Sequence, residues 1–146
     1  MRDGWRRRCL TLLAILAGLI VVHEAGHFFA ATWQGIRVSG FSIGFGPTLW
    51  SRKDRHGIEW RLSAVPLGGF VKFFGDASGA SNQAPDLEQM SEADRRDCFH
   101  FRPLHQRAAV VAAGPVANFL LAFVIFAAGL VVVVAMIGTI RFTRAG

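Results

Sequence analysis

Residues 18–33 read GLIVVHEAGHFFAATW, a stretch in which two histidines and a glutamate interrupt an otherwise apolar run. Ionisable residues in such a run are energetically costly and usually mark a functional site. His23 and His27 are four positions apart, so on a helix both can reach one metal ion. Glu24 lies about 100° around the helix from His23, where it can take a proton from an attacking water without being a ligand. The spacing predicts that His23 and His27 bind a metal and that Glu24 is a general base.

Two long apolar blocks, at residues 9–33 and 108–140, dominate the 146-residue chain. Each exceeds the roughly 20 residues that a transmembrane helix needs. The second block is longer than one span requires, so it must tilt, protrude or break, and Gly114-Pro115 is the natural place for a break near its start. The arginines at 6–8 resemble the start of a signal peptide, but the first block is too long for one. We therefore predict two transmembrane helices in a single domain.

The net charge of +6 does not indicate a nucleic-acid binder. The basic residues are spread over both ends and the central region, and no basic helix interleaved with aromatic residues is present. Membrane lipids with anionic headgroups are the expected partner, and nucleic acid is not. Counts of basic residues near the span ends are almost equal on the two sides, so charge does not orient the helices. Cys9 and Cys98 form no CxxC pair, which indicates two unrelated free thiols.

The segment between the blocks divides into a β-rich part, residues 35–76, and a polar loop, residues 77–107. Alternating and glycine-rich sequence in the first part predicts up to four short strands, with a turn that places Gly57 at positive φ. Ser91 is expected to cap a short helix within the loop. Because the expected exposed residues of the sheet are largely apolar, we expect it to pack against the membrane or dip into it. These residues are Phe41, Ile43, Phe45, Trp50, Trp60, Val65, Leu67, Phe70, Phe73 and Phe74.

Polar residues elsewhere have simpler interpretations. His56, His100 and His105 lie in polar segments without a paired ligand motif, and we do not expect them to bind metal. Asn118 stands at the start of the second apolar helix. It either bonds to its own helical turn or faces the site and orients substrate or developing negative charge.

Four motifs in the same order give this chain a family resemblance. The H-E-x-x-H is followed by FSIGFGP at 41–47, PLGGFVK at 66–72 and QRAAVVAAGPVANF at 106–119. Together, over residues 20 to about 125, they resemble the site-2 protease family of intramembrane zinc metalloproteases, and most closely its bacterial regulator of sigma-E protease branch.

The resemblance implies a mainly α membrane protein, with two transmembrane helices flanking a small membrane-associated β-hairpin sheet and a polar loop. It implies Zn²⁺ held by His23 and His27, with Glu24 as the catalytic base. It also implies that Gly68 and Gly69 form a turn of a substrate-holding hairpin, and that Gly114 and Asn118 support the active site. The expected location is the bacterial inner membrane, with the loop between the helices on the cytoplasmic side. Expected substrates are single-pass membrane proteins such as anti-sigma factors.

One part of the family pattern is missing from this sequence. Family members take a third zinc ligand from the aspartate of an L-D-G motif on a later membrane helix, and they carry a periplasmic PDZ region after the second helix. Neither feature occurs in this sequence. Two histidines alone do not complete the three-ligand site of catalytic zinc. We therefore expect either the N-terminal part of a longer protein, whose missing C-terminal helices carry the third ligand, or a truncated homologue. The six aspartates lie outside both apolar blocks, at Asp3, Asp54, Asp76, Asp86, Asp94 and Asp97.

Three functions follow as hypotheses. The leading one is an intramembrane zinc endopeptidase that cleaves transmembrane segments. The alternative is a catalytically inactive homologue that binds such segments without cleaving them. A metal-transporting helix pair is disfavoured, because Thr139 is the one polar residue that follows Asn118 in the second block.

Overall fold

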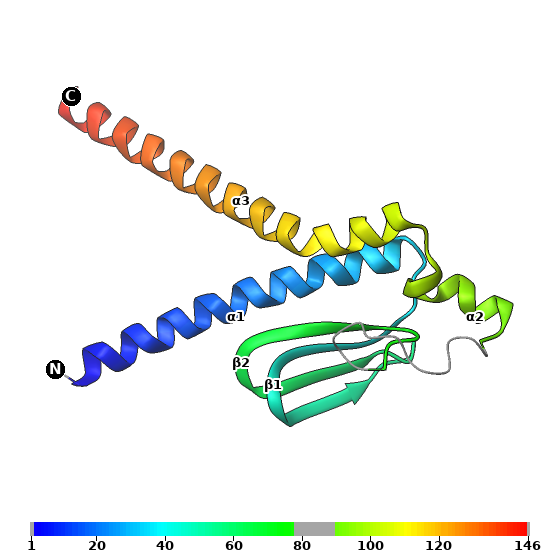
Figure 1. The fold of residues 1–146 in the computed structure, drawn as a ribbon. Helices are drawn as coiled ribbons and strands as arrows, with labels where there is room; N and C mark the ends of the chain where they lie inside the picture. The colour runs from blue at the N-terminus through cyan, green and yellow to red at the C-terminus, as the bar shows by residue number, and fades with distance from the viewer. Residues whose placement is uncertain (1, 78–89, 146) are drawn as a thin grey trace.

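A computed structural model of the protein describes residues 2–77 and 90–145, with side chains described for 4–77 and 90–140. Two long helices and a hairpin make up most of it (Figure 1). The elements in chain order are α1 (Arg2–Trp33), β1 (Val38–Lys53), β2 (Glu59–Phe73), α2 (Glu92–Asp97), the 3-10 helix η2 (Phe99–Phe101) and α3 (Leu104–Ala145).

Both predicted apolar helices are present, and both are longer than the sequence suggested. The first begins at Arg2 instead of residue 9, because arginine is a good helix former and continues the helix into the basic segment. The second begins at Leu104 instead of 108, directly after Pro103, whose carbonyl accepts the backbone N–H groups of Gln106 and Arg107. By length and composition, Gly4–Trp33 and Leu104–Ile140 could each cross a membrane.

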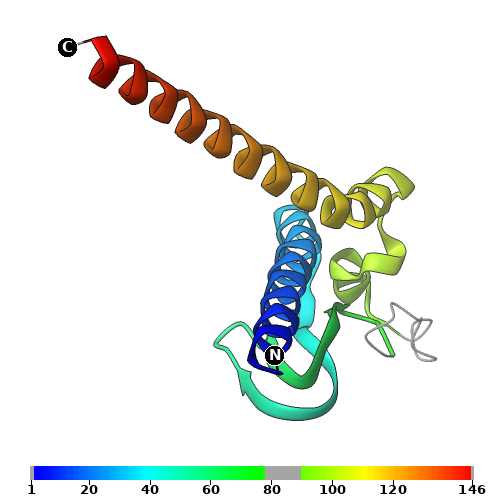
Figure 2. The same ribbon diagram turned by 90° about the vertical axis from the view of Figure 1, so that its left-hand side faces the viewer.

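The helix does not end at Gly114-Pro115, the natural place for a break, because α3 is one continuous helix with Pro115 inside it. The helix nevertheless changes direction in its yellow stretch, where Figure 1 shows α3 beginning to diverge from α1. A proline inside a helix removes one backbone hydrogen bond and clashes with the preceding turn, which bends the helix without ending it. In the view turned by 90°, the C-terminal part of α3 also extends away from α1 and the hairpin (Figure 2).

The β-rich part is one antiparallel hairpin and not four separate short strands. Both strands are long and bent, so that Gly40 lies opposite both Lys72 and Glu59. The first half of β1 therefore lies between two parts of β2. Gly44, with φ of +85°, lies where the register of the hairpin shifts, in a conformation that a side chain would oppose. The predicted turn with Gly57 is confirmed, with φ of +84°.

Gly68 and Gly69 do not form the turn that the family resemblance implied, because both lie within β2. Each allows a close approach instead. A side chain on Gly68 would overlap the Phe45 ring, and one on Gly69 would lie 2.6 Å from the Ser42 carbonyl oxygen. Glycine inside a strand often marks such an approach of another group to the backbone.

One apolar core joins α1, the hairpin, η2 and the start of α3. Phe41 and Phe73 belong to this core, so the expectation that they are exposed is wrong. The alternation of the strands turns Phe41 toward Phe28 of α1, where Trp60 also packs. Other residues of the predicted set are exposed near the bend of the hairpin, namely Phe45, Trp50, Val65 and Leu67.

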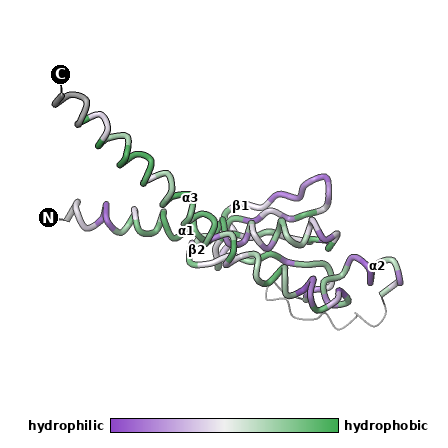
Figure 3. Tube along the Cα trace, turned by 90° about the horizontal axis from the view of Figure 1, so that it is seen from above, coloured by the Kyte–Doolittle hydropathy of each residue, from purple (hydrophilic) through white to green (hydrophobic). Residues whose placement is uncertain are grey.

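Polar contacts fix the short helices against the hairpin. Ser91 caps α2 as predicted, since its hydroxyl accepts the Asp94 backbone N–H. Arg37 pairs with Asp97 at 2.7 Å, and His100 pairs with Asp76 at 2.8 Å. The predicted flexible loop falls largely at 78–89, outside the described residues. Figure 3 shows the resulting separation, with apolar helical arms and polar segments around α2 and one end of the hairpin.

Candidate metal centre

His23 and His27 lie on the face of α1 that meets α3, as their spacing predicted. Their ring centroids are 4.8 Å apart, with the ring planes at 80°. A Cβ placed on Gly114 of α3 would lie 2.8 Å from His23 Nε2 and would also overlap His27 Nε2. Both Nε2 atoms therefore point to the same small space beside Gly114, which is open because that residue has no side chain.

The other ring nitrogen of His27 fixes its tautomer. His27 Nδ1 lies 2.7 Å from the Val110 carbonyl oxygen. A carbonyl can only accept, so Nδ1 carries the proton and donates it. The Nε2 lone pair is then free to bind a metal ion, and this Nδ1–H to carbonyl bond is the usual support of a metal-binding histidine.

Asn118 supports His23 in the same way. Its side-chain amide lies 3.3 Å from His23 Nδ1, while its Oδ1 is buried without a partner among the described residues. Oxygen and nitrogen of an amide are assigned from the hydrogen-bond network. With the amide turned by 180°, Oδ1 accepts the His23 Nδ1–H, which satisfies the buried oxygen and leaves Nε2 free for a metal. Asn118 therefore faces the site between the helices, where its side chain contacts His23.

Glu24 lies against the hairpin. A Cβ on Gly69 of β2 would lie 2.9 Å from Glu24 Cγ. The absence of a side chain at Gly69 thus lets the Glu24 carboxylate lie between α1 and the strand. A carboxylate on the same turn of helix as two convergent imidazoles is suited to take a proton from a water bound beside them.

Close packing of α1 and α3 holds these groups together. A Cβ on Gly26 would overlap the Ala113 carbonyl oxygen and lie 2.9 Å from Ala117 Cβ. Small residues at such a crossing let two helix backbones approach closely. The helix-to-helix contacts therefore depend on Gly26 for the same reason that the histidine site depends on Gly114.

The described residues contain no group of three His, Cys, Asp or Glu side chains that could hold a metal ion. His100 is occupied by its pair with Asp76, and the His56 backbone N–H donates to Asp54. The two convergent histidines fit a zinc ion in donor type and tautomer, and they supply two of the protein ligands that a catalytic zinc site uses.

Sequence reasoning missed the Val110 carbonyl, because a backbone acceptor leaves no mark in residue identity. A signal was nevertheless present, since Val110, Gly114 and Asn118 are spaced four apart and share one face of α3. The same spacing separates His23 and His27 on α1. Rows of residues four apart on two facing helices are the commonest packing ridges, which predicts that these two rows meet.

Comparison with known proteins identifies the family. The model of peptidase family M50 matches residues 11–143. A protein of Rhizobium meliloti that carries a provisional name as a zinc metalloprotease is 52% identical over 80% of this chain and 32% of its own length. Metalloprotease MmpA of Caulobacter vibrioides is 44% identical over 88% of this chain and 34% of its own length. The regulator of sigma-E protease of Salmonella typhimurium is 47% identical over 84% of this chain and 25% of its own length.

The chain thus spans between a quarter and about a third of the length of these relatives. The match nevertheless covers most of both long helices, the whole hairpin and every residue of the candidate metal centre. The resemblance found in the sequence is confirmed, and the chain belongs to peptidase family M50, the site-2 protease family of zinc metalloproteases.

Proposed function

We propose that this chain forms the H-E-x-x-H-bearing part of a zinc-dependent intramembrane endopeptidase. The observation that carries the proposal is the convergence of His23 and His27 Nε2 on the space beside Gly114. Each imidazole has its Nδ1 engaged, by the Val110 carbonyl and the Asn118 amide, so both present a lone pair to the same point. Further support comes from the names of two relatives, one a zinc metalloprotease and the other a metalloprotease.

In this proposal His23 and His27 are zinc ligands and Glu24 is the general base. Bound zinc would polarise the scissile carbonyl and lower the pKa of the attacking water toward about 7. Glu24 takes the proton of that water and delivers it to the leaving amine nitrogen. Asn118 and the Val110 carbonyl hold the two imidazole rings in orientation. A third ligand is expected from further membrane helices, as in the aspartate of the family's L-D-G motif.

We further propose that α1 and α3 cross the bacterial inner membrane and that the hairpin and α2 lie on its cytoplasmic side. The lengths and compositions of the two helices support the crossing. The exposed apolar bend of the hairpin supports contact with lipid or with an unwound substrate segment. Substrates would be transmembrane segments of single-pass proteins, such as anti-sigma factors, which accords with a relative named as a regulator of sigma-E protease.

The variant Glu24→Gln tests the proposal. The protein is expressed from its own gene and assayed in the membranes of the expressing cells. Glutamine keeps the size of Glu24 but cannot accept a proton, so cleavage of a co-expressed single-pass substrate should fall by at least about 10²-fold. Immunoblotting of the substrate measures the cleavage. Glu92→Gln is the matched control, because Glu92 lies exposed on α2, and this variant should cleave normally.

The same experiment separates the enzyme from the alternative, a binding module that holds membrane segments without cleaving them. If wild type captures the substrate segment but leaves it intact, and Glu24→Gln captures it equally well, the endopeptidase proposal is wrong. If cleavage occurs and depends on Glu24, the binding module is excluded.

A further inference from the structure

The hairpin carries a group of polar and charged side chains on the face turned away from α1. Phe41, Trp60 and Val71 point into the core, so the alternating residues point outward. A hollow of about 210 Å³ lies on this outward face. The side chains around it include Ser42, Glu59, Arg61, Phe70 and Lys72.

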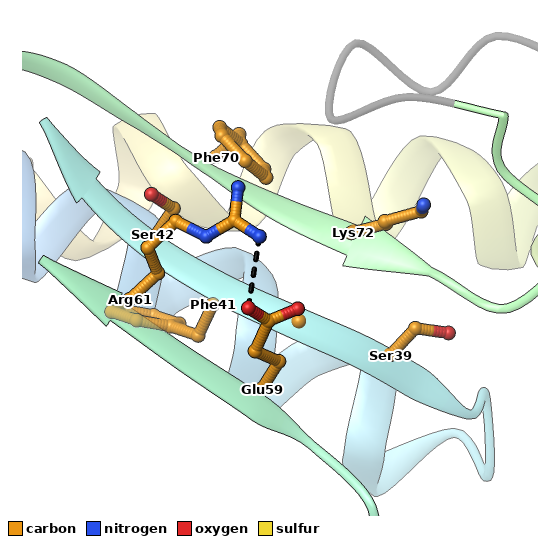
Figure 4. Close-up of a pocket in the computed structure, with 8 residues that line it drawn as sticks. Ser39, Phe41, Ser42, Glu59, Arg61, Phe70 and Lys72 are labelled. Atoms are coloured by element: carbon orange, nitrogen blue, oxygen red, sulfur yellow. Dashed lines mark hydrogen bonds and ion pairs between the residues drawn. The ribbon is translucent and has the colours of Figure 1, made fainter. Parts of the chain in front are cut away.

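Figure 4 shows this hollow with Glu59, Arg61 and Phe70 on the viewer's side of the sheet and the helices behind it. Ser42 comes from the first half of β1, and its hydroxyl lies beside the stem of Arg61 (Figure 4). Three strand segments thus contribute to one hollow, because the first half of β1 pairs with two parts of β2.

Ser42 is the most unusual of these residues. It is 1% exposed, and its Oγ has no hydrogen-bond partner among the described residues. Leaving a buried hydroxyl unpaired costs about 1–3 kcal/mol. A ligand with an acceptor atom in the hollow would satisfy this donor.

The charges around Ser42 indicate which ligand that is. Arg61 and Lys72 bring two positive charges, and Glu59 brings one negative charge. Glu59 Oε1 already accepts from Arg61 Nη2 at 2.8 Å and from Ser51 Oγ at 3.0 Å. Those two hydrogen bonds, and to a lesser extent the charge of Lys72, lower the pKa of Glu59. The hollow therefore keeps one net positive charge and several unused N–H donors, which suits a singly charged phosphodiester.

The position of the hollow along the hairpin points to a lipid. On one side of the hollow, Lys53 lies opposite Glu59 across the two strands and Ser51 lies opposite Arg61, so this part of the hairpin is polar. Trp50, one residue further along β1, lies opposite Leu62, and both are exposed.

Beyond that pair the bend exposes more apolar side chains, namely Phe45, Leu49, Val65 and Leu67. The change from polar to apolar surface thus falls within one residue of Arg61. In a membrane, that level is where phospholipid phosphates lie and where tryptophan is enriched.

We propose that this hollow binds the phosphate of a membrane phospholipid headgroup, with Ser42, Arg61 and Lys72 as its ligands. Phe70 and the apolar bend would then face the glycerol and acyl chains of the same lipid. The bound lipid would hold the hairpin at a fixed depth in the membrane, and so hold Gly69 beside Glu24. This inference rests on the membrane placement in the proposed function but not on peptide cleavage.

The test is lipid binding, measured by native mass spectrometry on the protein purified in detergent and titrated with dioleoyl phosphatidylglycerol. Wild type should retain one tightly bound lipid. Lys72→Gln and Arg61→Gln should each weaken this binding by about tenfold or more, because each removes a charged ligand of the phosphate. Lys72 forms no ion pair with a described residue, so Lys72→Gln tests the site even if Arg61→Gln disturbs folding.

Arg55→Gln is the matched control, because it removes the same charge from the exposed hairpin turn outside the hollow. It should bind the lipid like wild type, and so should Glu24→Gln, which removes the proposed activity alone. Dioleoylglycerol, which lacks the phosphate, should not occupy the site. The proposal is overturned if Lys72→Gln and Arg61→Gln bind the lipid as wild type does, or if Arg55→Gln loses as much affinity as they do. Displacement of the lipid by an equal concentration of inorganic phosphate would also overturn it, since the site would then recognise free phosphate.

Discussion

His27 Nδ1 lies 2.7 Å from the carbonyl oxygen of Val110, a contact that joins the metal-binding motif of α1 to the facing row of α3. The bond turns His27 Nε2 toward Gly114, where it meets His23 Nε2. The metal centre is therefore a property of two packed helices and not of the H-E-x-x-H helix alone. The α3 residues that hold the two histidines in place can be tested by substitution, although none of them is proposed to bind the metal.

Gly114→Ala should weaken zinc binding at least about tenfold, the loss typical when the support of metal ligands is disturbed. The added methyl would overlap Nε2 of both histidines. Gly129→Ala is the matched control on the same helix, because nothing lies within 4 Å of its Cβ position. The zinc affinity of the two purified variants and of wild type, measured by competition with a chelator, checks the prediction. Equal zinc affinity in Gly114→Ala and wild type would show that the metal does not lie between these nitrogens.

Asn118→Leu should lower zinc affinity by about 10–100-fold, the usual effect of removing a hydrogen-bond partner of a metal-binding histidine. Asn118→Asp should retain most of the affinity, because a carboxylate can still accept the His23 Nδ1–H. Competition with a chelator measures both affinities. If Asn118→Asp lost as much as Asn118→Leu, the amide would act as a donor to His23, and the tautomer assigned here would be wrong.

Much of the site was predictable from sequence, because it depends on side chains at helical spacing. The period of 3.6 residues places His23 and His27 on one face of a helix, and the four ordered motifs indicate the family. The helix cap at Ser91 and the positive φ of Gly57 were also predictable, since both follow from local chemistry. The Val110 carbonyl was not, because every residue carries the same backbone acceptor.

The errors in the hairpin share one cause, which is that tertiary contacts decide between structures that the local sequence permits equally. Gly68 and Gly69 fit a turn, but they also fit a strand that Phe45 and Glu24 approach closely, and the structure has the second. Which one forms depends on tertiary contacts that local sequence does not specify. For the same reason Phe41 was expected to be exposed, although the packing of α1 against the hairpin buries it.

Gly26→Ala should destabilise the protein by about 1–3 kcal/mol, the typical cost of adding a methyl group to a well-packed contact. The added Cβ would overlap the Ala113 carbonyl oxygen and force α1 and α3 apart. Gly18→Ala is the control on the same helix, with nothing within 4 Å of its Cβ position. It should be neutral or slightly stabilising, because alanine is the better helix former. Thermal unfolding in detergent distinguishes the two, and equal melting temperatures would contradict the close helix contact.

Asp76→Asn should change how stability depends on pH. Asp76 Oδ2 accepts the Phe73 backbone N–H at 3.0 Å, and its Oδ1 lies 2.8 Å from His100 Nε2. Burial raises the pKa of Asp76 above its ordinary value of 3.8, an effect that these hydrogen bonds and the charge of Lys72 offset only in part. The folded protein thus binds this proton more tightly than the unfolded chain does. The free energy of unfolding therefore falls as pH rises from about 3.8 to the raised folded value, and it is level above that value.

Because Asp76→Asn has no carboxyl to titrate, it should lack this fall. The melting temperature of the variant, relative to wild type, should rise with pH across that window and then become constant. Melting temperatures in detergent, measured from about pH 2 to 7, give this comparison.

Asp54→Asn should give the opposite trend in the same titration and serves as the matched control. The Trp60 indole N–H donates to Asp54 Oδ2 at 3.0 Å, and the backbone N–H groups of His56 and Ile58 donate to Oδ1. These bonds, that of Trp60 above all, lower the pKa of Asp54. Its stabilising contribution is therefore complete above the ordinary aspartate pKa and is lost as pH falls through the lower folded value. Asp54→Asn should melt below wild type at neutral pH, with a difference that shrinks on acidification. If both variants shifted the pH profile in the same direction, burial would not be the cause of the Asp76 effect.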